Sequence, residues 1–271
     1  MNYLLLANVS TNTLLVVIGI VAVLAIVFAA FIVLVSKLCA VPTDEKTEKI
    51  KEQLAGANCG GCGFAGCADF AAALAQGKAD ISGCGSTPPE NKKIIAEIMG
   101  IPFSGEEKKV AVVHCAGGEV ALDKFEYVGN ESCAAQASFM GGKKVCIYGC
   151  LGGGSCEKAC IYNAISVKNG VAVVNDTLCE ACGVCVNGCP KRVIGFMPQS
   201  AKVYIACSSH CKGKDVMAAC KVGCISCGMC ARVCPNKAIT MVDNIPVIDY
   251  SKCTGCLTCS EKCPRKCIKT K

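Results

Sequence analysis

The sequence of 271 residues has no tryptophan, only two histidines and few aromatic residues of any kind. No Ser-His-Asp set, phosphate-binding loop or pair of catalytic carboxylates stands out in it, which argues against hydrolysis and phosphoryl transfer. A Rieske centre needs two histidines and two cysteines on one cluster, and the positions of His114 and His210 give no such spacing. The chemistry of this chain must therefore be sought in other residues.

Cysteine is abundant instead, with 27 residues in the chain. A share this high is typical of disulfide frameworks, metal sites or redox centres. The formal charge of +7 counts every thiol as neutral. Five 4Fe-4S clusters, each about −2 with its four thiolates, would bring the protein to about −3. The basic balance is therefore weak evidence for a nucleic-acid or anionic-lipid partner.

A run of 22 uncharged residues, 14–35, predicts a transmembrane helix, since it rises about 33 Å. A signal peptide is the competing interpretation, but no basic segment precedes the run, the apolar part is too long, and residues 36–39 make a poor cleavage site. No lysine precedes the run, and four follow it closely: Lys37, Lys46, Lys49 and Lys51. We therefore expect a single-pass protein of the cell membrane with its bulk in the cytoplasm, where metal ligation is favoured over disulfides.

The predicted fold class is α+β. The predicted parts are a transmembrane anchor (1–36), a solvated linker (37–53), a 4Fe-4S module (54–105) and two ferredoxin-like two-cluster domains (106–200 and 201–271). Pro88-Pro89 marks a turn or a helix start, and residues 110–113 predict a short buried strand. Residues 171–174 and 246–248 predict further strands.

The last two parts form an internal repeat, because nine cysteines recur 74 residues later. The pairs are Cys133 and Cys207, Cys146 and Cys220, Cys150 and Cys224, Cys156 and Cys230, Cys160 and Cys234, Cys179 and Cys253, Cys182 and Cys256, Cys185 and Cys259, and Cys189 and Cys263.

The second copy holds two runs of the form C-x2-C-x2-C-x3-C-P, starting at Cys224 and Cys253, which are typical of bacterial two-cluster ferredoxins. The fourth cysteine of each run ligates the other cluster. This crossover predicts cluster 4 on Cys224, Cys227, Cys230 and Cys263, and cluster 5 on Cys234, Cys253, Cys256 and Cys259. Zinc is disfavoured, because such runs crowd too many thiolates for one tetrahedral ion.

The first copy lacks one ligand, since Gly153 stands at the position equivalent to Cys227. The simplest replacement is Cys146. We therefore predict cluster 2 on Cys146, Cys150, Cys156 and Cys189, and cluster 3 on Cys160, Cys179, Cys182 and Cys185.

The module of residues 54–105 has C-x2-C-x4-C-x16-C spacing, which predicts cluster 1 on Cys59, Cys62, Cys67 and Cys84. Residues 61–66 also match the dinucleotide pattern G-x-G-x-x-G, but no strand precedes them and cluster ligation explains their neighbours better. Five clusters use 20 of the 27 cysteines. Cys115, Cys133, Cys207, Cys211 and Cys220 are candidate extra ligands of a sixth cluster, and buried free thiols are an equal alternative. Cys39 is expected to be a thiol at the membrane boundary, and Cys267 is left without a role.

Together these features resemble the B-subunit family of Rnf complexes, the ion-translocating ferredoxin:NAD oxidoreductases of bacterial membranes. The resemblance rests on the N-terminal helix, on residues 58–67 (NCGGCGFAGC), on residues 144–156 (KVCIYGCLGGGSC) and on the ferredoxin runs, and it covers nearly the whole chain. It implies a subunit that receives electrons from reduced soluble ferredoxin and relays them to the other subunits. In the family the electrons reach NAD, and Na⁺ or H⁺ is moved across the membrane.

The predicted mechanism is electron relay along a chain of clusters, with no bond made or broken in this subunit. In this interpretation the enzymatic activity belongs to the whole translocase, and the isolated subunit has no catalytic residue. One alternative is a membrane-tethered iron-sulfur subunit of a hydrogenase or formate dehydrogenase, although such subunits usually carry their helix at the C-terminal end. Another is a metal-structured scaffold without redox activity.

Overall fold

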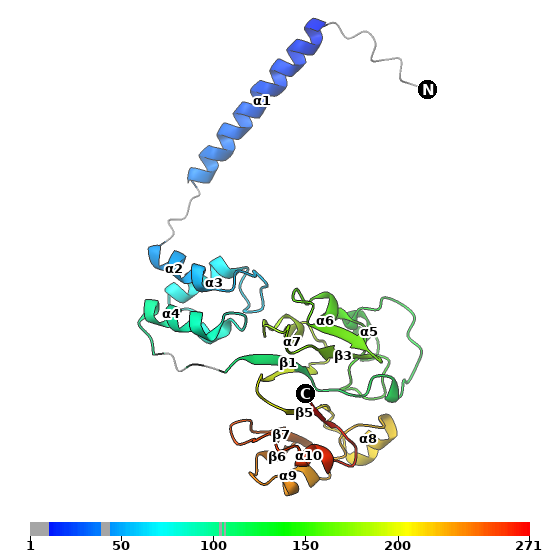
Figure 1. The fold of residues 1–271 in the computed structure, drawn as a ribbon. Coiled ribbons are helices and arrows are strands. Elements are labelled where there is room, and N and C mark those ends of the chain that lie inside the picture. Colours follow the sequence, from blue (N-terminus) through cyan, green and yellow to red (C-terminus); the bar gives the residue numbers. More distant parts are fainter. Residues whose placement is uncertain (1–10, 39–43, 103–104, 106) are drawn as a thin grey trace, which may run out of the picture. The chain divides into compact units, whose positions relative to one another are not determined.

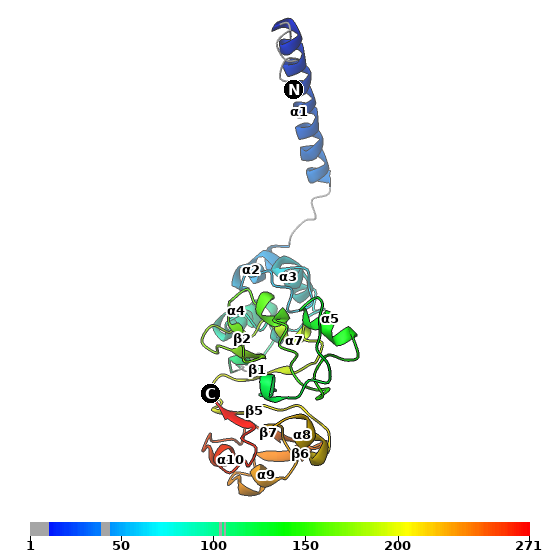
Figure 2. The same ribbon diagram turned by 90° about the vertical axis from the view of Figure 1, so that its right-hand side faces the viewer.

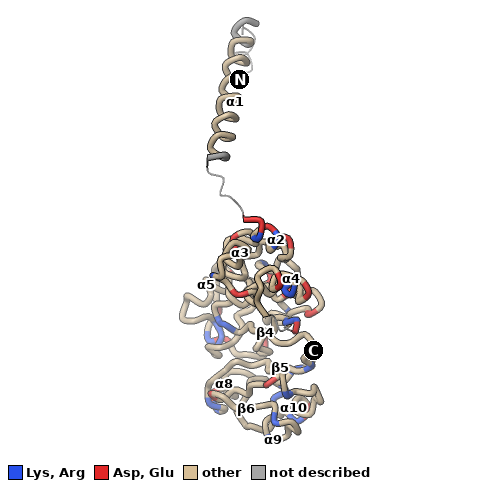
Figure 3. Tube along the Cα trace, turned by 90° about the vertical axis from the view of Figure 1, so that its left-hand side faces the viewer, with Lys and Arg blue, Asp and Glu red and all other residues tan. Residues whose placement is uncertain are grey.

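The structure is a computed structural model that describes residues 11–38, 44–102, 105 and 107–271. Its contacts divide the chain into two units, residues 1–44 and 45–271. In the first unit the described part is helix α1, Thr11–Leu38. Residues Leu15–Val35 of α1 have a mean hydropathy of 3.3 and none of that stretch is buried, so the helix is long and apolar enough to cross a membrane. Figure 3 draws no charged residue along this stretch of α1.

The second unit begins with a helical module of four elements: α2 (Glu45–Gln53), α3 (Cys67–Ala75), the 3-10 helix η1 (Ile81–Gly83) and α4 (Pro89–Met99). Pro89 stands at the first position of α4, and Gly100 ends that helix in the left-handed region with φ 71°. The predicted helix start at Pro88-Pro89 is thus confirmed.

Helix α2 differs from the solvated linker expected over 37–53. Its Ile50 is fully buried, and it packs in one core with Phe70 and Leu74 of α3 and Ile95 of α4. A single apolar residue among charged ones leaves no periodic signal in the sequence. Its burial against helices from later in the chain makes residues 45–53 part of the module.

In the described part of the chain, the strands form four two-stranded antiparallel sheets. They pair β1 (Lys109–Val113) with β4 (Ile194–Pro198), β2 (Ile165–Lys168) with β3 (Val171–Val174), β5 (Val203–Ile205) with β8 (Ile268–Thr270), and β6 (Ile239–Val242) with β7 (Ile245–Ile248). The strands predicted over 110–113, 171–174 and 246–248 are confirmed. The β2–β3 and β6–β7 hairpins each turn through two residues of positive φ, Asn169-Gly170 and Asp243-Asn244, as tight hairpin turns require.

Short helices complete the unit: η2 (Gly118–Val120), α5 (Cys133–Ser138), α6 (Ser155–Lys158), α7 (Val184–Asn187), α8 (Gly213–Ala219), α9 (Met229–Val233) and α10 (Thr258–Glu261). Five elements begin 74 residues after a counterpart of the same kind: α9 after α6, β6 after β2, β7 after β3, α10 after α7 and β8 after β4. The cysteine repeat is therefore accompanied by a repeat of secondary structure. Figures 1 and 2 draw the elements of the first copy and those of the second copy as two separate sets within this unit.

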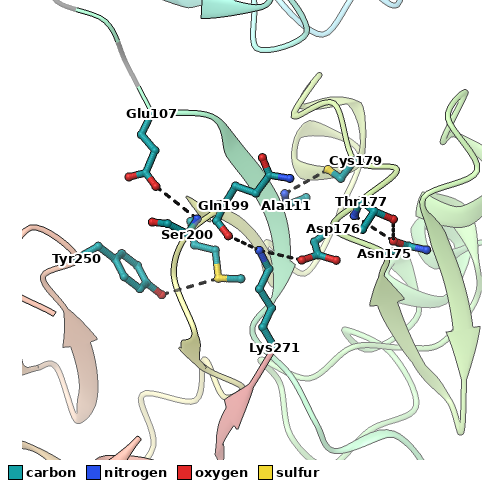
Figure 4. A network of polar contacts seen from close by, with 11 residues as sticks. Glu107, Ala111, Asn175, Asp176, Thr177, Cys179, Gln199, Ser200, Tyr250 and Lys271 are labelled. Atoms are coloured by element: carbon teal, nitrogen blue, oxygen red, sulfur yellow. Dashed lines mark hydrogen bonds and ion pairs between the residues drawn. The ribbon is translucent and has the colours of Figure 1, made fainter. Parts of the chain in front are cut away.

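Polar contacts join the two sets near the last residue of the chain (Figure 4). The Lys271 ammonium lies 3.0 Å from the Asp176 carboxylate and donates to the Gln199 carbonyl at 2.7 Å. The Tyr250 hydroxyl donates to the Val203 carbonyl at 3.3 Å, and its side chain packs against the hydrophobic cores of both sets. The repeats thus form one continuous body.

Candidate iron-sulfur cluster sites

The cysteines of the described residues form no disulfide, and most are buried or half-buried. Over the same residues, no three Cys, His, Asp or Glu side chains gather closely enough to hold a single metal ion. A zinc ion would need its sulfurs about 2.3 Å from one centre. The cysteines instead surround pockets, as expected if each thiolate binds a different iron of a larger group.

The first pocket is lined by all four cysteines predicted for cluster 1, Cys59, Cys62, Cys67 and Cys84. Asn58 has a φ of 46°, and its Oδ1 accepts a hydrogen bond from the Cys67 amide at 2.8 Å. This bond fixes the start of α3 beside the pocket. The Thr87 hydroxyl donates to Cys84 Sγ at 3.2 Å. The predicted ligand set is therefore brought together.

A cysteine of another part of the chain, Cys182, lines the same pocket. The module touches the Cys182 loop through glycines: a Cβ added at Gly61 would clash with the Cys182 carbonyl, 2.8 Å from its carbon atom, and one at Gly85 would lie 2.9 Å from the Ala181 carbonyl carbon. Only glycine permits this approach. The pocket of Cys59 thus borders the ligands predicted for cluster 3.

The cluster 3 cysteines lie together around Cys185. Burial raises the pKa of the Cys185 thiol to about 12, and Cys179, Cys182, Cys156 and Cys160 raise it further, in that order. Cys160 and Cys179 also raise the pKa of Cys182. The Ala111 amide donates to Cys179 Sγ and the Ala164 amide to Cys160 Sγ, each at 3.3 Å. The thiol that lies outside the Cys179 run, Cys160, therefore does reach the cysteines of that run.

One pocket gathers the four cysteines predicted for cluster 4, Cys224, Cys227, Cys230 and Cys263. Burial raises the pKa of Cys230 to about 11, and the other three cysteines add to the rise. No role was predicted for Cys267, yet it lines this pocket too, is 2% exposed and lies 3.6 Å from Cys263 Sγ. A hydrogen bond with Cys267 lowers the pKa of Cys224 to about 6.

For cluster 5, Cys253 and Cys256 are neighbours of Cys259. Burial raises the pKa of Cys259, and these two cysteines raise it further. Cys234 packs against the same core as Cys253 and Cys259, and its Sγ accepts the Ala238 amide at 3.3 Å. This bond repeats the Ala164 to Cys160 bond at the equivalent position of the first copy.

The cluster 2 region places a different cysteine than expected beside Cys150, Cys156 and Cys189. The pocket that these three line contains Cys133, and Cys146 is not among its lining residues. Burial raises the pKa of Cys156 to about 11, and Cys150 and Cys133 raise it further. Cys133 lies at the start of α5, which is capped by the Ser132 hydroxyl.

Gly153 explains why Cys133 fits there. A Cβ at Gly153 would clash with the Glu131 carbonyl and lie 3.2 Å from the Cys133 amide nitrogen. The segment that carries Cys133 thus occupies the space of the missing side chain at the position equivalent to Cys227. No spacing rule in the sequence identifies this replacement, because Cys133 lies outside the run that it joins.

Neither histidine is among the residues that line these pockets. His114 Nδ1 lies 2.7 Å from the Ile205 carbonyl oxygen, and His210 Nδ1 lies 2.8 Å from that of Asp243. Cys39 lies outside the described residues. The donor sets of soft thiolates, with backbone amides directed at sulfur, fit 4Fe-4S clusters.

Known proteins support this chemistry. Residues 54–85 match the family model described as "Putative Fe-S cluster", and residues 223–267 match the model "4Fe-4S dicluster domain". The chain is 39% identical to the B subunit of the Na(+)-translocating ferredoxin:NAD(+) oxidoreductase complex of Acetobacterium woodii, over 95% of the chain and 78% of the relative.

Two further relatives are similar over nearly their whole length. The B subunit of the ion-translocating oxidoreductase complex of Methanosarcina acetivorans is 38% identical over 93% of the chain and 96% of the relative. The B subunit of the proton-translocating ferredoxin:NAD(+) oxidoreductase complex of Clostridium ljungdahlii is 37% identical over 95% and 93%. The family predicted from the sequence is thereby confirmed.

Proposed function

Because this chain belongs to the B-subunit family of Rnf-type ion-translocating oxidoreductase complexes, we propose that it is their membrane-anchored iron-sulfur electron carrier. It accepts electrons from reduced soluble ferredoxin and relays them to other subunits of a complex that reduces NAD and translocates Na⁺ or H⁺. The family membership favours this role over a subunit of a hydrogenase or formate dehydrogenase. Each bound cluster would supply a centre that gains and loses one electron.

We assign the ligands as follows: Cys59, Cys62, Cys67 and Cys84 for cluster 1; Cys133, Cys150, Cys156 and Cys189 for cluster 2; Cys160, Cys179, Cys182 and Cys185 for cluster 3; Cys224, Cys227, Cys230 and Cys263 for cluster 4; and Cys234, Cys253, Cys256 and Cys259 for cluster 5. Cys133 replaces Cys146 of the sequence-based prediction, because Cys133 shares a pocket with the other three thiols.

The observation that carries the proposal is that neighbouring sites share walls. Cys182, a ligand of cluster 3, also lines the pocket of cluster 1. Cys156 of cluster 2 is close enough to Cys185 of cluster 3 to raise its pKa, after burial, Cys179 and Cys182. The protein would thus hold successive clusters at short separations, which is what a relay requires of its residues.

The wider arrangement of the protein follows from the same role. We propose that residues 106–200 and 201–271 are duplicated ferredoxin-like domains, which the recurrence of five elements at an offset of 74 residues supports. Helix α1 anchors the chain in lipid. Lys46, Lys49 and Lys51 follow it closely, and this excess of positive charge supports a cytoplasmic position for the cluster sites, on the side where ferredoxin is found.

The test is Cys182→Ala in the full-length protein, prepared without oxygen and assembled in its complex. We expect a loss of about four iron atoms per chain, because one cluster loses a ligand, together with loss of ferredoxin-dependent NAD reduction. Leu178→Ala is the matched control, since Leu178 lies exposed in the same loop. Unchanged iron content with unchanged ferredoxin-dependent activity would refute the proposal.

A further inference from the structure

Six cysteines line one cavity in the described part of the chain, and none of the five ligand sets accounts for it. The cavity measures about 170 Å³ and lies between the two repeats. One of its cysteines, Cys150, is assigned to cluster 2, and the other five come from both copies: Cys115 and Cys146 from the first, and Cys207, Cys211 and Cys220 from the second. These are the thiols that remain after the five ligand sets are assigned, apart from Cys39 and Cys267.

Four of the five thiols face one another. A Cβ added at Gly117 would lie 3.4 Å from Cys220 Sγ and 3.7 Å from Cys115 Sγ, so these two sulfurs flank one glycine that leaves the space open. Burial raises the pKa of Cys146, and three neighbours raise it further, namely Cys115, Cys220 and Cys211. Cys146 therefore has the other three within electrostatic range.

Cys207 is the exception. Its Sγ accepts the amide of Cys224 at 3.3 Å. Burial raises the pKa of Cys207 to about 11, and Cys224 is the first of the cysteines that raise it further, ahead of Cys146. This thiol is directed toward the cluster 4 pocket rather than toward the other four.

The walls of the cavity are fixed by buried polar contacts. Lys144 is 5% exposed. Its ammonium donates to the carbonyls of Gly118 and Ala121 at 2.9 and 3.1 Å and pairs with Asp123 at 2.9 Å. On the other side, Arg265 donates to the Cys220 carbonyl at 2.6 Å. These contacts hold the Gly117 loop and the Cys220 backbone in place without any ligand.

The chemistry of the cavity matches that of the other sites. Four soft thiolates from separate segments surround it, whereas no three described side chains gather on a single ion. The amides of Gly117 and Cys150 each donate to Cys115 Sγ at 3.4 Å, as amides do to the sulfurs of bound clusters.

We propose that Cys115, Cys146, Cys211 and Cys220 bind a sixth 4Fe-4S cluster between the two repeats. This inference rests on the proposed function and completes its path. Cys150, a cluster 2 ligand, lines the same cavity, and Cys207 on its wall bonds to Cys224, a cluster 4 ligand. A cluster held by these four thiols would gain and lose one electron and would connect cluster 2 with cluster 4. This electron transfer moves no proton and needs no further reactant.

The first experiment counts iron and acid-labile sulfide in anaerobic full-length protein. We expect about 24 iron atoms per chain, and a loss of about four in Cys211→Ser. Cys207→Ser is the matched control, because Cys207 lines the same cavity without serving as a ligand, and it should keep all six clusters. Absorption and paramagnetic resonance spectra of the other clusters check that each variant is folded.

Pairs of substitutions identify which cluster Cys146 serves. If Cys146 and Cys211 bind the same cluster, Cys146→Ser with Cys211→Ser loses only about four iron atoms, as the single variants do. Cys146→Ser with Cys156→Ser should lose about eight, because Cys156 belongs to cluster 2. A loss of only about four in the second pair would return Cys146 to cluster 2 and overturn the proposal.

Three other outcomes of the iron analysis would overturn the sixth cluster, and one would overturn the proposed function. About 20 iron atoms in the wild-type protein, with no change in Cys211→Ser, would remove the sixth cluster and leave the proposed function intact. Loss of iron in Cys207→Ser but not in Cys211→Ser, or zinc in the reconstituted protein in place of the missing iron, would overturn it as well. A wild-type protein without iron would instead defeat the proposed function itself.

Discussion

The contact between the Cys59 module and the Cys182 loop can be tested with one methyl group. In Gly61→Ala the new Cβ would clash with the Cys182 carbonyl, 2.8 Å from its carbon atom. Ordinary contact between carbon atoms begins at about 3.5 Å, so the two segments must separate by at least several tenths of an ångström. Both partners are backbone, which cannot rotate away as a flexible side chain would.

Overpacking of this kind costs about 1–3 kcal/mol, which would weaken docking of the module by about 5- to 150-fold. The four cluster 1 ligands lie within the module itself, so the iron content should stay at the wild-type value. What changes is the communication between clusters 1 and 3. The magnetic interaction between the two reduced clusters, seen as broadening in the paramagnetic resonance spectrum, should weaken, and electron transfer between them should slow.

Gly83→Ala is the matched control in the same module. Its Cβ would meet only the Phe70 ring, at 3.5 Å, which is ordinary van der Waals contact. This variant should keep wild-type spectra and rates. If Gly61→Ala also kept both, with iron content unchanged, then the close approach of Gly61 to Cys182 would not be what couples the two clusters.

Two further predictions concern single thiols and pH. Cys267→Ala removes the thiol that forms a hydrogen bond with Cys224. Because hydrogen bonds to sulfur favour the reduced cluster, the midpoint potential of cluster 4 should fall while the iron content stays constant. A redox titration that gives the wild-type potential would contradict this. In the iron-free protein, the folded-state pKa of Cys185, about 12, and of Cys156 and Cys230, about 11, exceed the ordinary value of 9.0, so the unfolded chain releases these protons first. The stability that these protonated thiols contribute is therefore fully present below about pH 9 and is lost as pH rises through about 11–12, since the unfolded state binds fewer protons than the folded state over this range. Urea unfolding midpoints should fall over this range for the iron-free protein only, because the ligands of bound clusters are already thiolates. A flat pH dependence would show that burial does not hold these protons.

The local features of the fold followed directly from the sequence. An uncharged run of 22 residues predicts a helix long and apolar enough to cross a membrane, because a helix satisfies its backbone internally, and α1 is that helix. The strands over 110–113 and 171–174 were likewise evident from short runs of valine and alanine. By contrast, α2 has only Ile50 buried among charged residues, so its packing partners decided its place.

The proposed cluster ligands likewise include some that local sequence spacing predicts and some that only tertiary packing brings together. A C-x2-C-x2-C run wraps three thiols around one site by local geometry, so the sequence by itself was enough to predict most of each proposed set and the crossover, and it identified the family. It did not determine that Cys133 lies over Gly153, or that Cys115, Cys146, Cys211 and Cys220 meet at one cavity. Those thiols come from separate segments, and only the tertiary packing of the two repeats brings such segments together, because no local spacing restricts the distance between them.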